Sequence, residues 1–176
     1  MLLVLLAGCA GTTAKPAHEG ISLDQHLPLR IAVDMSPEDL AERTQHYYNA
    51  WIYYYVNSWY DEGKMVRNAA VTAFSPLAEQ VLPRDQMPAP DFIIKVTGTS
   101  VYNPAMQNFY INVTATGYLP NGQEMGSFKA KWVAVGVLAF YEQELEKAYV
   151  TAFQDIGRQF LQSGALNVAA RQSATN

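Results

Sequence analysis

The chain has 176 residues, 49% of them hydrophobic and 16% charged, which is enough apolar material for the core of one domain. The formal net charge is −4 and no cluster of Lys and Arg occurs, so the composition argues against a nucleic-acid-binding surface. A single cysteine excludes an intramolecular disulfide, and the fold must therefore depend on packing alone.

The N-terminus begins with MLLVLLAGC, in which a short apolar run and two small residues precede Cys9. Residues 10–26 are small and polar, with Pro and Gly among them. Such a composition buries too little apolar surface to order itself, so we predict a flexible tether over residues 9–26. We expect a single folded α+β domain over residues 27–162 and a loose C-terminal tail over residues 163–176.

The Leu-Ala-Gly-Cys sequence at residues 6–9 resembles the lipobox of bacterial lipoproteins. The resemblance implies that residues 1–8 are a signal peptide that is removed, and that Cys9 carries a diacylglycerol and a further acyl chain such as palmitate. Two or three acyl chains hold a protein stably on a membrane, whereas one is marginal. Ala10 after the cysteine implies the outer membrane. Secretory signals begin with basic residues and none precedes Cys9, so we expect the natural start to lie upstream of Met1.

The first element of the expected domain is a strand over residues 27–35, LPLRIAVDM, in which apolar and polar residues alternate. Ser36 then provides a helix N-cap and Pro37 the first helical position, with two acidic residues in the first turn. This pattern predicts a helix of about two turns that ends near Thr44.

The segment YYNAWIYYYVNSWY, residues 47–60, concentrates eight aromatic residues, while the whole chain has 11 Tyr, 7 Phe and 3 Trp. A strand would place Trp51, Tyr53 and Tyr55 on one face. A helix would instead align Tyr47 and Trp51 with Tyr54 or Tyr55. Aromatic and β-branched residues favour strands, and we therefore predict a strand here.

A helical pattern follows from residue 63 to residue 81, with Pro76 expected to bend or divide the helix. Residues 82–90 contain three prolines and are predicted to form a loop. Alternating patterns predict strands over residues 91–99, 108–119 and 124–134, and Asn121-Gly122 predicts a hairpin turn between the last two.

A final helix is predicted over residues 141–162, ended by Gly164. The element order predicts an α+β fold with a mainly antiparallel sheet of about five strands and two long helices packed on one face.

Few residues suggest catalysis or metal binding. His18, His26 and His46 are isolated and lack the short spacings of metal ligands. No nucleophile elbow, phosphate-binding loop or dinucleotide fingerprint occurs, and the adjacent Asp61 and Glu62 are typical of a loop. We expect no catalytic residues, no metal, no cofactor and no enzymatic activity.

The aromatic segment is the candidate functional surface, with Trp51, Tyr53, Tyr55 and Trp59 as its residues. Helices on one side of a sheet leave the other side exposed, and an exposed apolar row marks a binding surface. Three alternatives stay open at this point: contact with a protein partner or a second copy, complete burial in the core, and stacking of the rings on a glycan.

The whole layout resembles YajG-like lipoproteins and the TolB N-terminal-like fold of small envelope lipoproteins. It shares with them a lipobox, a tether, a first strand LPLRIAVDM, a helix with AFSPLAEQV, a hairpin around PNGQEM and the closing helix AYVTAFQDIGRQFL. The resemblance implies a lipid-anchored periplasmic accessory or assembly protein that acts by protein–protein contact or self-oligomerisation. The alternative is a carbohydrate-binding module for peptidoglycan or exported polysaccharide.

Overall fold

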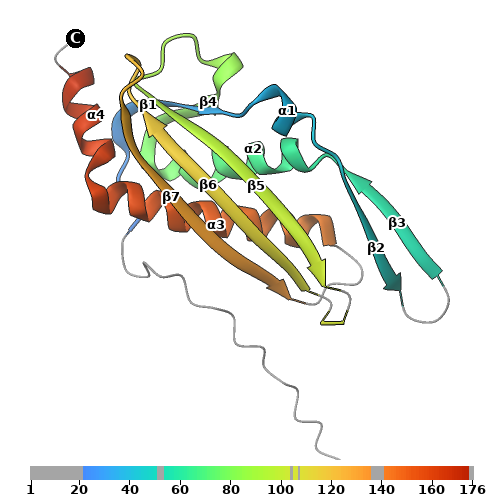
Figure 1. Cartoon of the computed structure of the whole chain (residues 1–176). Helices are drawn as coiled ribbons and strands as arrows, with labels where there is room; N and C mark the ends of the chain where they lie inside the picture. Colours follow the sequence, from blue (N-terminus) through green and yellow to red (C-terminus); the bar gives the residue numbers. More distant parts are fainter. Residues whose placement is uncertain (1–21, 51–53, 104, 107, 136–140, 175–176) are drawn as a thin grey trace, which may run out of the picture.

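The computed structural model describes residues 22–50, 54–103, 105–106, 108–135 and 141–174 (Figure 1). Cys9 and the predicted signal peptide lie outside these residues. The strands are β1 (Leu27–Asp34), β2 (Thr44–Ala50), β3 (Tyr54–Tyr60), β4 (Ala78–Pro83), β5 (Phe92–Asn103), β6 (Asn108–Tyr118) and β7 (Glu124–Val135). The helices are α1 (Pro37–Leu40), α2 (Glu62–Phe74), α3 (Tyr141–Ser163) and α4 (Ala165–Ser173).

Five strands form one mixed sheet in the order β4-β1-β5-β6-β7. β1 runs parallel to both β4 and β5, whereas β5, β6 and β7 form an antiparallel meander. The prediction of an α+β fold with about five sheet strands is confirmed, but the expectation of a mainly antiparallel sheet is corrected. β1 lies inside the sheet, and its residues Leu29, Ile31, Ala32 and Val33 are fully buried.

The parallel part of the sheet was not predicted because β4 was read as the end of a helix. α2 ends at Phe74, and a 3₁₀ turn at Ser75–Leu77 leads into β4. Pro76 has no N–H to continue the helical ladder, so the chain leaves the helix there. The strand then runs through Pro83, into the segment that was predicted to be a loop.

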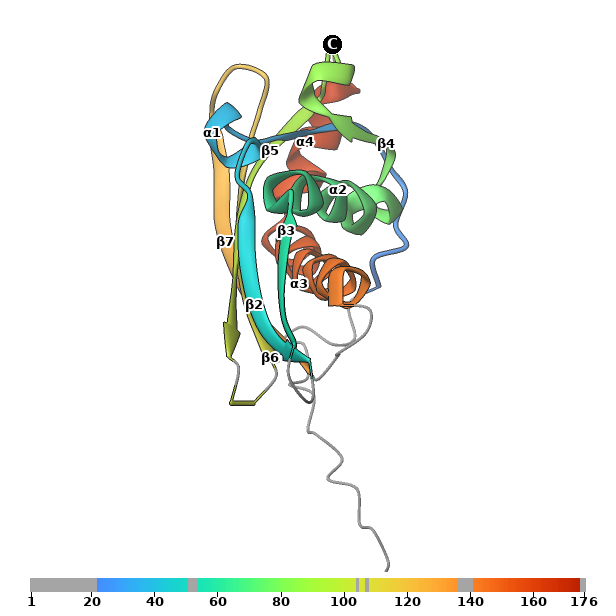
Figure 2. The ribbon, with the colours of Figure 1, turned by 90° about the vertical axis from the view of Figure 1, so that its right-hand side faces the viewer.

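α2, α3 and α4 all lie on one face of the sheet (Figure 2). This arrangement agrees with the predicted one-sided packing, but three helices longer than one turn are present among the described residues, not two. α1 is a single turn that ends at Leu40, shorter than predicted. Within the described residues, no helix combines the length and the apolar character that a membrane crossing needs.

The C-terminal residues that were predicted to be a loose tail form α4. Gly164, with φ +77°, adopts the left-handed conformation that ends α3, and α4 begins at the next residue. Ala165, Leu166 and Ala169 are buried against the domain. Burial of this apolar stripe, together with the helix propensity of alanine, orders a segment whose polar composition suggested a tail.

The centre of the core is a cluster of phenylalanine rings between the sheet and the helices. Phe160 of α3 makes edge-to-face contacts with Phe74, Phe92 and Phe128, at centroid distances of 6.4, 5.9 and 4.7 Å. Gly117 of β6 lies under these rings, and a Cβ there would come within 2.5 Å of Phe92 Cζ. The body of the molecule is therefore closely packed.

Candidate functional site: an aromatic hairpin

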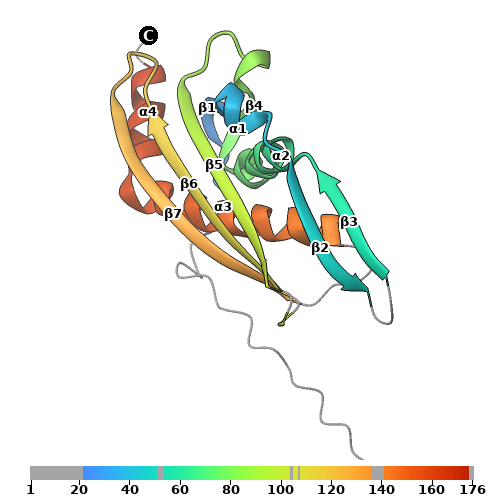
Figure 3. The ribbon, with the colours of Figure 1, turned by 45° about the vertical axis from the view of Figure 1, so that its right-hand side comes forward.

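The aromatic segment forms a two-stranded sheet that is separate from the main sheet. β2 and β3 pair antiparallel, from Thr44 opposite Tyr60 to Ala50 opposite Tyr54. Figures 1 and 3 show this hairpin extending beside β5, beyond the layer of α2 and α3. The predicted strand character is confirmed, but the segment contains two strands, because the chain reverses direction between residues 50 and 54.

The structure describes the four predicted site residues to different extents. Trp51 and Tyr53 lie outside the described residues. The backbone of Tyr55 belongs to β3, and its side chain is outside the description. Trp59 is described, and 51% of its surface is exposed. The strand register puts positions 55 and 59 on the same face of the hairpin, so the reversal does not separate these two.

Trp59 lies at the base of the hairpin and is covered on one side by Arg43. The guanidinium carbon of Arg43 is 5.8 Å from the centroid of the indole ring. Asp61 holds Arg43 in this position through an ion pair of 3.0 Å and also accepts a hydrogen bond of 2.9 Å from Lys64. The Lys64 hydrogen bond and charge, with help from Arg43, lower the pKa of Asp61. The indole therefore presents an apolar surface beside a fixed cation.

Glu62 joins the hairpin base to the body of the molecule. This first residue of α2 is only 2% exposed. Its Oε1 accepts hydrogen bonds from the Tyr149 hydroxyl of α3 and, at 2.6 Å, from Ser100 Oγ of β5. Its Oε2 accepts a hydrogen bond from Thr44 Oγ1, at the start of β2. Tyr60, at the end of β3, lies 2.8 Å from Ser100 Oγ and donates to it, because the single hydroxyl proton of Ser100 is used on Glu62.

This hydrogen-bond network holds both strands of the hairpin at their base. Thr44 and Tyr60 are opposite each other in the ladder, and both reach the same carboxylate, directly or through Ser100. None of the ion pairs among the described residues includes Glu62, and its hydrogen-bond donors among these residues are hydroxyl groups. Hydrogen bonds to a charged acceptor are stronger than neutral ones, and removal of a donor leaves a buried carboxylate under-satisfied.

The network also changes the pKa of its neighbours. Burial, followed by the negative charge of Glu62, raises the pKa of the Tyr149 hydroxyl far above its usual value. Burial, followed by repulsion from Glu62 and Asp39, raises the pKa of Glu42. Tyr149 therefore remains a hydrogen-bond donor at any physiological pH.

Sequence reasoning assigned Glu62 to a loop and did not identify Thr44, Ser100 or Tyr149 as its partners. These hydroxyl residues come from elements far apart in the chain, and no local pattern relates them to a carboxylate. The one available signal was the position of Glu62 directly after an aromatic strand and before an amphipathic helix.

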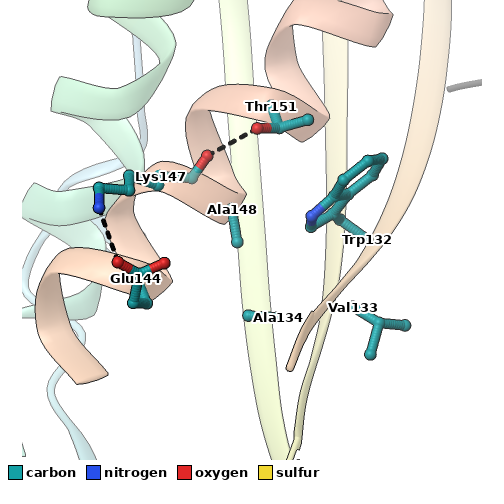
Figure 4. Close-up of a pocket in the computed structure, with 7 residues that line it drawn as sticks. All are labelled: Trp132, Val133, Ala134, Glu144, Lys147, Ala148 and Thr151. Carbon is teal, nitrogen blue, oxygen red and sulfur yellow. Dashed lines mark hydrogen bonds and ion pairs between the residues drawn. The ribbon is translucent and has the colours of Figure 1, made fainter. Parts of the chain in front are cut away.

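A shallow pocket of about 290 Å³ lies away from the hairpin, between α3 and the edge strand β7 (Figure 4). Its apolar wall is formed by Trp132, Ala134 and Ala148. Glu144 and Lys147 at its rim are paired with each other at 2.6 Å. None of the predicted site residues lines this pocket.

In the described part of the chain, no three His, Cys, Asp or Glu side chains approach closely enough to hold a metal ion. In the described part of the chain the hydrogen-bond partners of Glu62 are hydroxyl groups, and none of them is a histidine or a lysine. What the described residues do present is the half-exposed Trp59 on the hairpin and the hydrogen-bond network of Glu62 that anchors the hairpin base.

Comparison with known proteins establishes a shared fold. No family model matches the chain, and no curated protein matches its sequence. A Xanthomonas campestris protein of the DUF330 family has 12% identity and a TM-score of 0.53, covering 86% of this chain and 91% of that chain.

Two further solved structures have lower TM-scores. A PelC variant from Paraburkholderia phytofirmans, crystallised as a dodecamer, gives a TM-score of 0.48 at 11% identity, covering 75% of this chain and 90% of that chain. A candidate lipoprotein from Caulobacter crescentus gives 0.37 at 14% identity, covering 65% and 85%.

Proposed function

We propose that the chain is a lipid-anchored periplasmic accessory protein of the bacterial cell envelope, held on the outer membrane through Cys9. In this proposal it performs no catalysis and docks on another envelope protein, or on a second copy, through the β2–β3 hairpin. The Leu-Ala-Gly-Cys sequence supports the anchor. Loss of the chain from the membrane fraction in a Cys9→Ser variant tests it.

The observation that carries the docking role is an aromatic hairpin that projects from the body and is held at its base by a buried carboxylate. A hairpin of two strands alone is marginally stable in water, so its attachment to Glu62 gives it a defined direction. The half-exposed Trp59 beside Arg43 matches the aromatic and arginine residues that dominate protein interfaces.

Site-specific photo-crosslinking in the producing cell tests this role. A photoreactive residue at position 59 should give one discrete adduct with an envelope protein or with a second copy. A matched photoreactive residue at the exposed Asn167 should give none, because its helix, α4, lies on the side of the molecule away from the hairpin (Figure 1). Absence of an adduct at position 59, or equal adducts at both positions, would contradict the proposal.

Glycan binding is the second candidate, and the half-exposed indole of Trp59 favours it specifically. Sugar rings stack on exposed aromatic faces, and the neighbouring Arg43 could donate hydrogen bonds to sugar hydroxyls. A shift of tryptophan fluorescence on addition of peptidoglycan fragments, lost in Trp59→Ala, together with no crosslink at position 59, would select this candidate.

A further inference from the structure

The antiparallel part of the sheet has one face that the helices do not cover. α2, α3 and α4 pack on the opposite face (Figure 2), where Phe92, Ile94 and Ile111 are buried. On the uncovered face, strand alternation brings side chains of β5, β6 and β7 into adjacent rows.

We name the central rows of this surface the lysine face. Its residues are Lys95, Thr97, Thr99, Asn112, Thr114, Thr116, Ser127, Lys129 and Lys131. None of them is acidic, although the chain as a whole has a net charge of −4. The surface therefore carries local positive charge on an acidic protein.

Two of the three lysines have no ion-pair partner among the residues that the structure describes. Lys95 lies over the ring of Tyr118 at 5.3 Å, and its register partner on β1 is Asp34. Lys129 and Lys131 are exposed on β7, and neither belongs to an ion pair among the described residues. Val133 follows them on the same side of the strand. The order along β7 is therefore two cations, Lys129 and Lys131, and then one apolar residue.

The helix layer carries the complementary pattern on the other side of the molecule. Glu142 and Glu146 of α3 are exposed, and neither is in an ion pair among the described residues. Glu146 and Val150 line a groove of about 660 Å³ against Thr72 of α2, and Lys147, which also lines it, is paired with Glu144. Along α3 the order is Val150, Glu146, Glu142, which is one apolar residue followed by two anions.

The spacings of the two patterns agree. Alternate residues of a strand are about 6.6 Å apart, because the rise is about 3.3 Å per residue. Residues four apart on a helix are about 6 Å apart, because the rise is about 1.5 Å per residue. Superposition therefore brings Val133 opposite Val150, Lys131 opposite Glu146 and Lys129 opposite Glu142, within the reach of a lysine side chain.

We infer that the lysine face of one copy docks on the α2–α3 groove of a second copy, with Lys129 and Lys131 paired to Glu142 and Glu146. A long anionic polymer fits less well, since the net charge of −4 repels it and it supplies no apolar partner for Val133. Because the two surfaces are different, the contact is head-to-tail, and repetition builds a ring or an open chain. This contact uses neither face of the hairpin and goes beyond the proposed function.

Charge reversal on each surface tests the contact in the full chain carrying Cys9→Ser, which cannot be acylated. By sedimentation, the parent should self-associate, more weakly at high salt. Lys129→Glu/Lys131→Glu and Glu142→Lys/Glu146→Lys should each weaken association by about tenfold or more, because they place like charges opposite each other. An equimolar mixture of the two variants should restore association, since every contact then joins opposite charges.

The control variant is Glu79→Lys on β4, outside both surfaces, which should leave association unchanged. Unaltered circular dichroism and unfolding midpoints show that the exposed substitutions do not unfold the chain, and Lys129→Gln/Lys131→Gln provides a milder second variant. Failure of the mixture to restore association overturns the inference. So does a parent that stays monomeric, or one that instead binds heparin through Lys129 and Lys131. Trp59→Ala should not change this association. The test of this contact can therefore fail or succeed independently of the test of hairpin docking.

Discussion

The body and the hairpin of this molecule are stabilised by different interactions. The body is held by apolar packing, with Phe160, Phe74 and Phe92 fully buried between the sheet and the helices. The hairpin is attached through hydroxyl groups that converge on Glu62. We therefore expect that the hairpin can be altered or removed while the body stays folded, as the proposed docking role requires.

The largest effect is expected in the body. Phe160→Ala removes a buried ring that touches three others and should lower the free energy of unfolding by about 3–5 kcal/mol. Denaturant unfolding measures this loss, and Met106→Ala, at a residue that is 62% exposed, is the matched control. A loss similar to that of the control would mean that the ring cluster is not central to the body.

Tyr149→Phe tests the junction between the two regions. The change keeps the buried ring and removes one donor from Glu62, so the free energy of unfolding should fall by about 2 kcal/mol. Hydrogen exchange should accelerate in β2 and β3 more than in β6. Equal acceleration everywhere would show that Tyr149 stabilises the body without anchoring the hairpin.

Much of the body could be predicted from the sequence, since β5, β6 and α3 show regular apolar periods and Asn121-Gly122 marks a turn. The change of direction inside the aromatic segment could not be predicted, because aromatic residues fill both strands and no Gly or Pro marks the turn. β4 was missed because its few residues continue the apolar spacing of α2. The Glu62 network depends on three distant hydroxyl residues, Thr44, Ser100 and Tyr149, which only the tertiary fold brings together.

Asp91→Asn tests a pH dependence that belongs to the body alone. Arg30 donates hydrogen bonds of 2.9–3.1 Å to Asp91 and lowers the pKa of that carboxyl group. A lowered pKa in the folded state gives stability at neutral pH that is lost as the pH falls through that pKa. The variant should therefore be less stable than the parent at neutral pH and equally stable in strong acid. We expect the loss at neutral pH to be smaller than that caused by Tyr149→Phe. The measurement is the unfolding free energy of both proteins from neutral pH to strong acid. A difference that stays constant over this pH range would contradict the assignment of the pH dependence to Asp91.

Among the single substitutions that test these hydrogen bonds, Thr44→Val should have the smallest effect on the whole molecule and the most local one. It keeps the side-chain shape and removes the donor to Glu62 Oε2 from a hydrogen bond that is only partly buried, so the expected loss is at most about 1 kcal/mol. Hydrogen exchange should accelerate at the base of β2 and β3 while the amides of β6 stay protected. Uniform exchange would place the hairpin and the body in one cooperative unit.

The central claim is that the hairpin serves docking and not folding. A variant in which Asn-Gly replaces residues 46–58 and Ala replaces Trp59 keeps Thr44, Tyr60 and the Glu62 network, and closes the base with a tight turn. The measurement is the apparent mass of the envelope complex that contains the anchored chain in mild detergent, beside the unfolding free energy of the same variant. We predict a clear decrease in mass with the unfolding free energy unchanged within about 0.5 kcal/mol. An unchanged mass, or a variant that no longer folds, would contradict the account.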